Sequence, residues 1–198
     1  MTQDILSDRD LNVIFREARS FKGWQDIAVS EITIRAMYDL LRWGPTSFNC
    51  SPARFIIVQS AAAKKNLADC AMRSNKAKIL SAPFTVILAS DAKFYDRLPV
   101  LFKSYPAAKD TYAKDEALAQ ETAFRNSSLQ GGYMIIAARA LGLDCCPMSG
   151  FDADKVNATF FKGRDYSANF ICSMGYGDAA SLPQRDERLP FDEACEII

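Results

Sequence analysis

Two cations flank a serine in the segment Arg19-Ser20-Phe21-Lys22, which Gly23 follows. A guanidinium and an ammonium group attract a phosphate by charge, and a serine hydroxyl can hydrogen-bond to it. The segment is therefore a candidate phosphate-binding loop. A solvated basic loop would have the same composition, so the residues alone leave both interpretations open.

A second group of polar side chains lies in the loop Thr46-Ser47-Phe48-Asn49-Cys50-Ser51, between Pro45 and Pro52. Hydroxyls and an amide held between two prolines suit the recognition of a polar heterocycle. They suit an ordinary tight loop equally well. This loop is the second candidate for a binding function.

Small residues, Ser149-Gly150, end a short apolar run over 143–148 that has the length of a strand. Such residues leave backbone N–H groups exposed at the carboxyl end of the strand, where α/β sheets bind ligands. The sequence therefore predicts a binding site at this strand end.

The 198 residues include no histidine. This absence excludes Ser-His-Asp and Cys-His catalysis and histidine-based zinc sites, and it removes the commonest general base. No metal site is expected. If the protein is an enzyme, a cofactor should carry the hard chemistry.

The composition is that of one globular domain over 1–198, with 49% hydrophobic and 24% charged residues. The formal net charge of zero argues against nucleic acid or an anionic membrane as the main partner. No apolar run approaches the roughly 20 residues of a membrane span, and the amino terminus is acidic rather than a signal peptide. We expect a cytoplasmic protein whose six cysteines are buried thiols.

The elements that must position these groups alternate between helices and strands. We predict helices over 4–18, 30–43, 61–72, 74–82 and 153–161, and strands over 54–59, 84–89, 143–148 and 169–175. The continuous apolar run 84–89 is typical of a parallel sheet. Residues 91–115 are interpreted as a helical excursion that could cover a pocket. The alternation predicts an α/β or α+β sandwich, without the glycine motif of a Rossmann site or a P-loop.

A central helix is predicted from about Asp115 to Leu141, with Gly142 as its left-handed C-cap. Its second half, 133–141, is apolar almost all round, so we expect it to be buried on every side. Gly131-Gly132 interrupts the helix at about 1 kcal/mol per glycine relative to alanine. Close helix–helix packing would explain this pair, and so would a flat ligand lying against that face.

These segments, in order and across nearly the whole chain, resemble the flavin-dependent nitroreductase family. The matching segments are Arg19-Ser20-Phe21-Lys22 to its Arg-Ser-x-Arg/Lys, 42–55 to its loop RWAPSxxNxQPWRF, Asn75 and Lys78 to its Asn-x-x-Lys pair, 147–152 to its Pro-x-x-Gly-Phe-Asp, 175–178 to its Gly-Tyr-Pro/Gly-Asp, and 188–190 to its closing Lys-x-Arg-Leu-Pro.

The resemblance implies an α+β nitroreductase-like sandwich, in which helices flank a mostly antiparallel or mixed central sheet. It implies FMN as cofactor, NADPH or NADH as co-substrate, and a homodimer with FMN at the interface, in which residues 182–198 cross to the partner. The residues that it assigns to FMN are Arg19, Ser20, Lys22, Pro45, Thr46, Ser47, Asn49, Ser51, Asn75, Lys78, Pro147, Met148, Ser149, Gly150, Arg185 and Arg188.

Two positions depart from the family pattern. Ser51 replaces the usual glutamine of the loop, and Asp186 stands where the first cation of Lys-x-Arg would be. Arg185, one position earlier, is the candidate to replace that cation. Without it, the FMN phosphate would depend on Arg19, Lys22 and Arg188, and the affinity for FMN would be low.

Within the family, four segments resemble the malonic semialdehyde reductases of uracil catabolism: GPTSFNCSPAR, QETAFRNSS, PMSGFD and RLPFDEAC. The substrate carboxylate would need a cation near the flavin, and Arg54 and Arg125 are the candidates. For each arginine, an ordinary ion pair is the alternative. Broad reduction of nitroaromatic compounds or quinones is a rival activity, and a flavin-binding protein without turnover is a rival of another class.

Overall fold

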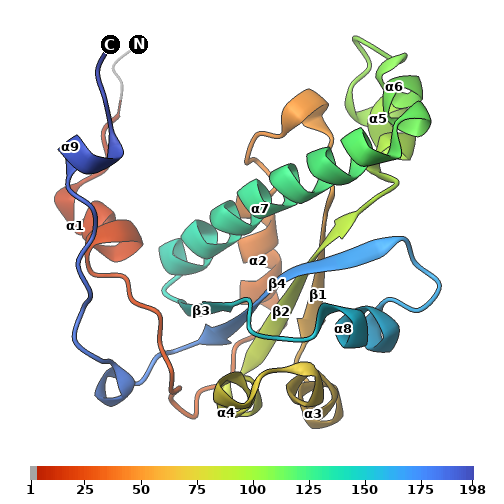
Figure 1. Cartoon of the computed structure of the whole chain (residues 1–198). Coiled ribbons are helices and arrows are strands. Elements are labelled where there is room, and N and C mark those ends of the chain that lie inside the picture. The colour runs from red at the N-terminus through yellow and green to blue at the C-terminus, as the bar shows by residue number, and fades with distance from the viewer. Residues whose placement is uncertain (1–3) are drawn as a thin grey trace.

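Four strands form one antiparallel sheet in the order β1-β2-β4-β3 (Figure 1). The computed structural model describes residues 4–198. The strands are β1 (Ala53–Val58), β2 (Phe84–Asp91), β3 (Asp144–Met148) and β4 (Tyr166–Gly175). The parallel pairing that we expected for the apolar run 84–89 is wrong, because β2 pairs antiparallel with both neighbours. The run is apolar because β2 is central and every one of its residues is buried.

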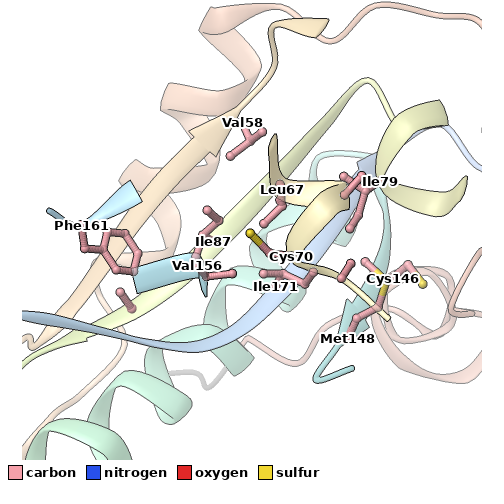
Figure 2. Close-up of a cluster of buried hydrophobic side chains, with 13 residues drawn as sticks. Val58, Leu67, Cys70, Ile79, Ile87, Cys146, Met148, Val156, Phe161 and Ile171 are labelled. Atoms are coloured by element: carbon pink, nitrogen blue, oxygen red, sulfur yellow. The ribbon is translucent and has the colours of Figure 1, made fainter. Parts of the chain in front are cut away.

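Helices cover both faces of the sheet and make a sandwich (Figure 1). The α2 helix (Glu31–Leu41) and the α7 helix (Glu116–Ala140) pack on one face, together with the side chain of Cys145. The α3 (Ala61–Cys70), α4 (Arg73–Ser81) and α8 (Ala153–Phe160) helices pack on the other, where Figure 2 shows the core with Cys146. Cys145 and Cys146 thus point to opposite faces, as the alternation of a strand requires.

Local capping residues explain where several helices begin and end. Ser30 accepts a hydrogen bond from the Thr33 amide at 3.1 Å, as predicted for the start of α2. Gly142 has a φ of +76° and ends α7 as the predicted left-handed cap. The predicted helix over 4–18 is shorter, because a capping box at Ser7 starts α1 at Asp8 (Asp8–Leu11) and a π-helical turn, η1 (Asn12–Arg16), ends it.

The second half of α7 is not buried on every side, contrary to our expectation, because Tyr133 and Ala140 are exposed. Gly131 faces the sheet so closely that a Cβ atom there would lie 2.5 Å from the Phe170 ring, which makes this a helix–sheet contact rather than a helix–helix contact. Gly132 faces open space. The outer face of α7 exposes large apolar side chains, namely Phe124, Leu129 and Tyr133.

Residues 91–115 form the expected helical excursion, with η3 (Phe94–Arg97), α5 (Leu98–Leu101) and α6 (Ala108–Lys114). Its aromatic side chains pack against the loop that contains η2 (Ser47–Asn49). The carboxyl-terminal tail holds η4 (Ala179–Ser181) and α9 (Phe191–Ala194), and residues 183–198 are exposed throughout. Cys195 lies in this tail and is exposed, so the expectation of six buried thiols is wrong for this residue.

Within residues 4–198, no helix has both the length and the apolar composition that crossing a bilayer requires.

Candidate functional site

The amino-terminal segment and the tail meet beside the first residues of β3 (Figure 1). Ser20 forms a parallel bridge with Cys145, which fixes the segment 19–22 along the edge of the sheet. Arg19 donates a hydrogen bond to the Pro183 carbonyl at 2.6 Å, and Arg185 donates one to the Ala18 carbonyl at 3.0 Å. These reciprocal bonds place Arg185 next to Arg19.

Arg188, the other tail cation that we assigned to FMN, turns back on its own segment. Its guanidinium donates to the carbonyl groups of Asp186 and Glu187 at 3.1 and 2.9 Å. In the described chain, Arg185 rather than Arg188 therefore complements the cations of the amino-terminal segment.

Two side chains of α4 reach the end of β3. Lys78 donates to the Asn75 Oδ1 atom at 3.0 Å, and the Asn75 Nδ2 atom donates to the Gly150 carbonyl at 3.0 Å. The Met72 amide donates to the same carbonyl at 2.9 Å. Gly150 allows this close approach, because a Cβ atom there would lie only 2.7 Å from Asn75 Nδ2.

The backbone at 147–150 is the part of β3 that can serve a ligand. The Met148 side chain belongs to the buried core (Figure 2), so only its backbone is available. Pro147 and Ser149 are exposed. The Ser149 and Gly150 amides donate no hydrogen bond outside the sheet ladder to any of residues 4–198. These two N–H groups are therefore free to meet an electron-rich atom.

The positive charges of Lys22 and Lys78 converge on one buried thiol. Burial raises the pKa of Cys146, and the charges of Lys78 and Lys22 each offset part of that rise. We call the set Arg19, Lys22, Asn75, Lys78, Gly150 and Arg185 the cationic cluster. None of its four cations forms an ion pair with a carboxylate within residues 4–198. Four uncompensated positive charges suit a multiply charged anion such as a phosphate.

The loop 45–52 lies at the end of the sheet opposite the start of β3. Its Pro52 carbonyl accepts a hydrogen bond from the Asp91 amide at 2.9 Å, where β2 ends. Inside the loop, the Thr46 Oγ1 atom accepts from the Ser51 amide at 3.1 Å. Asn49, which we had assigned to the heterocycle, donates its side-chain amide to the Leu101 carbonyl at 2.9 Å.

The register of the sheet separates this loop from the segment 19–22, which lies beside Cys145. The end of β3 lies nearer the middle of the sheet, because Met148 pairs with Ile171, which pairs with Ile87. Cys145 pairs with Met174, which pairs with Phe84, whereas Ala53 pairs with Ser90. The distance from Phe84 to Ser90 along β2 is roughly 20 Å. A single chain therefore divides the residues that we assigned to FMN into two groups.

Two residues that the sequence did not single out, Asn126 and Gln130, bond the backbone at the two ends of this loop. The Asn126 Oδ1 atom accepts from the Ser47 amide at 2.8 Å, and the Gln130 Oε1 atom accepts from the Ala53 amide at 2.9 Å. Each residue is 5% exposed. Their spacing, one helical turn apart on the buried side of a helix, is the signal that could have identified them.

The two arginines proposed for a substrate carboxylate have different surroundings. Arg54 pairs with Asp91 at 2.5 Å and also donates to the Ser51 and Ala53 carbonyls, so three of the N–H groups of its guanidinium bond within this chain. Arg125 is exposed on α7 and, among residues 4–198, pairs only with Glu121, one turn earlier. Arg54 thus fits the alternative of an ordinary ion pair, and Arg125 is accessible from solvent.

A hollow of about 850 Å³ lies between α2 and β1, and it is lined in part by Ile34, Tyr38, Phe55 and Ile57. No residue of the cationic cluster lines it.

Residues 15–176 match the model of the Nitroreductase family. A relative from Ralstonia nicotianae, provisionally named NADH dehydrogenase/NAD(P)H nitroreductase, is 50% identical over 188 residues, covering 95% of this chain and 96% of its own. The crystal structure of a provisionally named nitroreductase from Bacillus subtilis is similar at a TM-score of 0.85 and 19% identity, covering 97% of this chain and 100% of its own. A structure from Exiguobacterium sibiricum in complex with FMN has the same TM-score at 20% identity and covers all of both chains.

Proposed function

Because the chain belongs to the nitroreductase family, we propose that it is an FMN-dependent NAD(P)H oxidoreductase that reduces a small-molecule acceptor. The observation that carries this proposal is the cationic cluster, whose four cations form no ion pair within residues 4–198, together with the two free amides at the end of β3. FMN, when bound, takes a hydride from a nicotinamide and passes reducing equivalents to the acceptor.

The chain's own residues bind and orient this cofactor. Arg19, Lys22 and Arg185 attract the phosphate, and Lys78 with Asn75 faces the ribityl chain and the ring. The Ser149 and Gly150 amides are pre-organised donors, which stabilise negative charge on the reduced ring without reorganising. Solvent supplies the proton, which fits a chain without histidine.

We infer that the loop 45–52 serves the FMN of a second copy. The loop lies at the end of the sheet opposite Cys145, beside which the segment 19–22 is held, so a loop from a second copy would complete the site around these cations. The exposed apolar side chains of α7 and the exposed tail 182–198 support a homodimer in which the tail crosses to the partner.

The proposed acceptor is malonic semialdehyde, and Arg125 is the cation proposed for its carboxylate. The support is the resemblance of four segments to the semialdehyde reductases and the accessibility of Arg125. Reduction of nitroaromatic compounds or quinones is the second candidate, which the name of the relative from Ralstonia nicotianae favours. Five buried cysteines, all free, fit a reducing compartment, and we place the reaction in the cytoplasm.

An anaerobic assay tests the activity. Purified protein with FMN is mixed with NADH or NADPH, and then with the semialdehyde, a nitroarene or a quinone. Bleaching of the flavin by a nicotinamide followed by reoxidation by an acceptor is expected. A yellow protein that neither nicotinamide bleaches would instead be a flavin-binding protein without turnover.

Arg125→Met separates the two acceptors. Loss of a bidentate arginine–carboxylate pair should raise the barrier by about 2–4 kcal/mol for the semialdehyde alone. We expect kcat/KM to fall at least about tenfold more for the semialdehyde than for a quinone. Arg35→Met is the matched control, because Arg35 is equally exposed and pairs with Glu31 one turn earlier. Equal losses for both acceptors would assign Arg125 to flavin binding or to the fold.

A further inference from the structure

The loop that contains η2 holds an unusual backbone. Phe48, Asn49 and Ser51 have φ angles of 53°, 51° and 40°, which lie in the left-handed region although none of them is glycine. Such conformations are unfavourable for L-residues and persist only where the surroundings hold them. Three of them within four positions require strong external constraints.

Two side chains of α7 supply those constraints at both ends of the loop. Asn126 accepts from the Ser47 amide at 2.8 Å and donates to the Thr122 carbonyl at 2.8 Å, so both atoms of its amide are used and its orientation is fixed. Gln130, one turn later, accepts from the Ala53 amide at 2.9 Å. The segment 47–53 is thereby clamped between two buried amides.

The helix that carries the clamp is itself fixed to the sheet. Asn169 lies at the irregularity of the β2–β4 register, between the pairs formed by Ala168 and Phe170. Its side-chain amide donates to the hydroxyls of Ser127 and Ser128 at 2.9 Å each. This β-bulge thus turns the side-chain amide of Asn169 toward α7, and its hydrogen bonds set the position of the helix relative to the loop.

We propose that Asn126 and Gln130 are positioning residues, which hold the loop 46–53 in its left-handed conformation and thereby set the affinity of the protein for the flavin ring. This inference depends on the proposed function, because it takes the loop as the part that recognises the heterocycle. Both residues act through the backbone of the loop, because each is 5% exposed and accepts a hydrogen bond from a backbone amide of the segment 47–53.

The test compares two flavins and several variants. Asn126→Leu and Gln130→Met remove one acceptor each with little change of shape, and Gln130→Glu keeps an acceptor for the Ala53 amide. The dissociation constants of FMN and of riboflavin, which lacks the phosphate, are measured by fluorescence. We expect both flavins to bind at least about tenfold more weakly to the first two variants, and Gln130→Glu to recover most of the loss.

Gln120→Ala is the control on the same helix, because Gln120 is exposed and bonds Glu116 one turn earlier rather than the loop or the sheet. A second pair of variants, at Ser47, tests the hydrogen bond between the Ser47 amide and Asn126 from its donor. Ser47→Pro deletes the donor, and the extended backbone of Thr46, with ψ of 154°, accommodates a following proline. Ser47→Ala keeps the donor. Wild-type affinity for both flavins in folded Asn126→Leu, Gln130→Met or Ser47→Pro would overturn the proposal, even if the variants unfold at lower urea.

A wild-type protein that binds neither flavin would refute the proposed function. In that case, amide hydrogen exchange tests whether Asn126 and Gln130 hold the loop. Faster exchange over 47–52 in Asn126→Leu than in Gln120→Ala would support the clamp. Equal exchange in the two variants would overturn it.

Discussion

Replacing Gly150 with alanine should break the contact that joins α4 to the end of β3. The new Cβ atom would lie 2.7 Å from the Asn75 Nδ2 atom and 3.1 Å from the Met72 sulfur. Met72 is exposed and flexible, so it can move aside. Asn75 is 7% exposed and is held by Lys78 and by the Gly150 carbonyl, so it can move only by losing both hydrogen bonds.

The expected loss of stability follows from the two hydrogen bonds of Asn75. A neutral hydrogen bond contributes about 1 kcal/mol and one to a charged group about 1.5–3 kcal/mol. Because Lys78 is partly exposed and can bond water instead, we expect Gly150→Ala to lower the free energy of unfolding by about 2 kcal/mol. FMN binding should weaken as well, since the same side chains are proposed to face the flavin.

A double-mutant cycle checks the mechanism. Asn75→Ala alone removes both bonds and should also lower the free energy of unfolding by about 2 kcal/mol in urea titrations. With Asn75 already shortened, the clash disappears, so adding Gly150→Ala should change stability by less than about 0.5 kcal/mol. Losses that simply add in the double variant would refute the assignment of the effect to Asn75.

Three further changes test other parts of the site and of the fold. Arg19→Ala should weaken FMN binding by about 1.5–3 kcal/mol and leave riboflavin binding unchanged in fluorescence titrations; equal losses for both flavins would separate Arg19 from the phosphate. Deleting 182–198 should give a monomer or an insoluble protein without FMN, and an intact flavin-loaded dimer by light scattering would contradict the crossing of the tail. Burial raises the pKa of Asp144, so the folded state holds its proton more tightly than the unfolded state, and wild-type stability falls as pH rises through the folded pKa. In urea titrations, Asp144→Asn should therefore gain stability relative to wild type as pH rises from about 4 to 7, and a difference that stays constant with pH would contradict this reasoning.

The sequence predicted the elements because their signals are local. The helix start at Ser30 and the cap at Gly142 depend on a few neighbouring residues, and both are confirmed. The direction of pairing of β2 is not local. Its apolar run shows that both faces are buried, but antiparallel and parallel neighbours produce the same run when helices cover both faces.

The same distinction between local and long-range signals holds for the candidate site. The residues of the cationic cluster could be identified from motifs, since each motif lies within a few positions. The partners of Arg54 and Asn126 could not, because Asp91 is 37 positions away from the first and Ser47 is 79 positions away from the second. A sequence can show a polar residue on the apolar side of a predicted helix. It does not show which distant backbone amide will donate a hydrogen bond to that residue in the fold.

The division of the flavin residues between the two ends of the sheet has a consequence for how the cofactor is retained. If each FMN requires a loop from another chain, cofactor binding and chain association are linked equilibria. Diluting the protein would then release flavin even at a constant concentration of free FMN, and excess FMN would oppose dissociation of the dimer. Occupancy would follow mass action in both components, so a yellow concentrate could turn into a colourless dilute solution without any loss of fold.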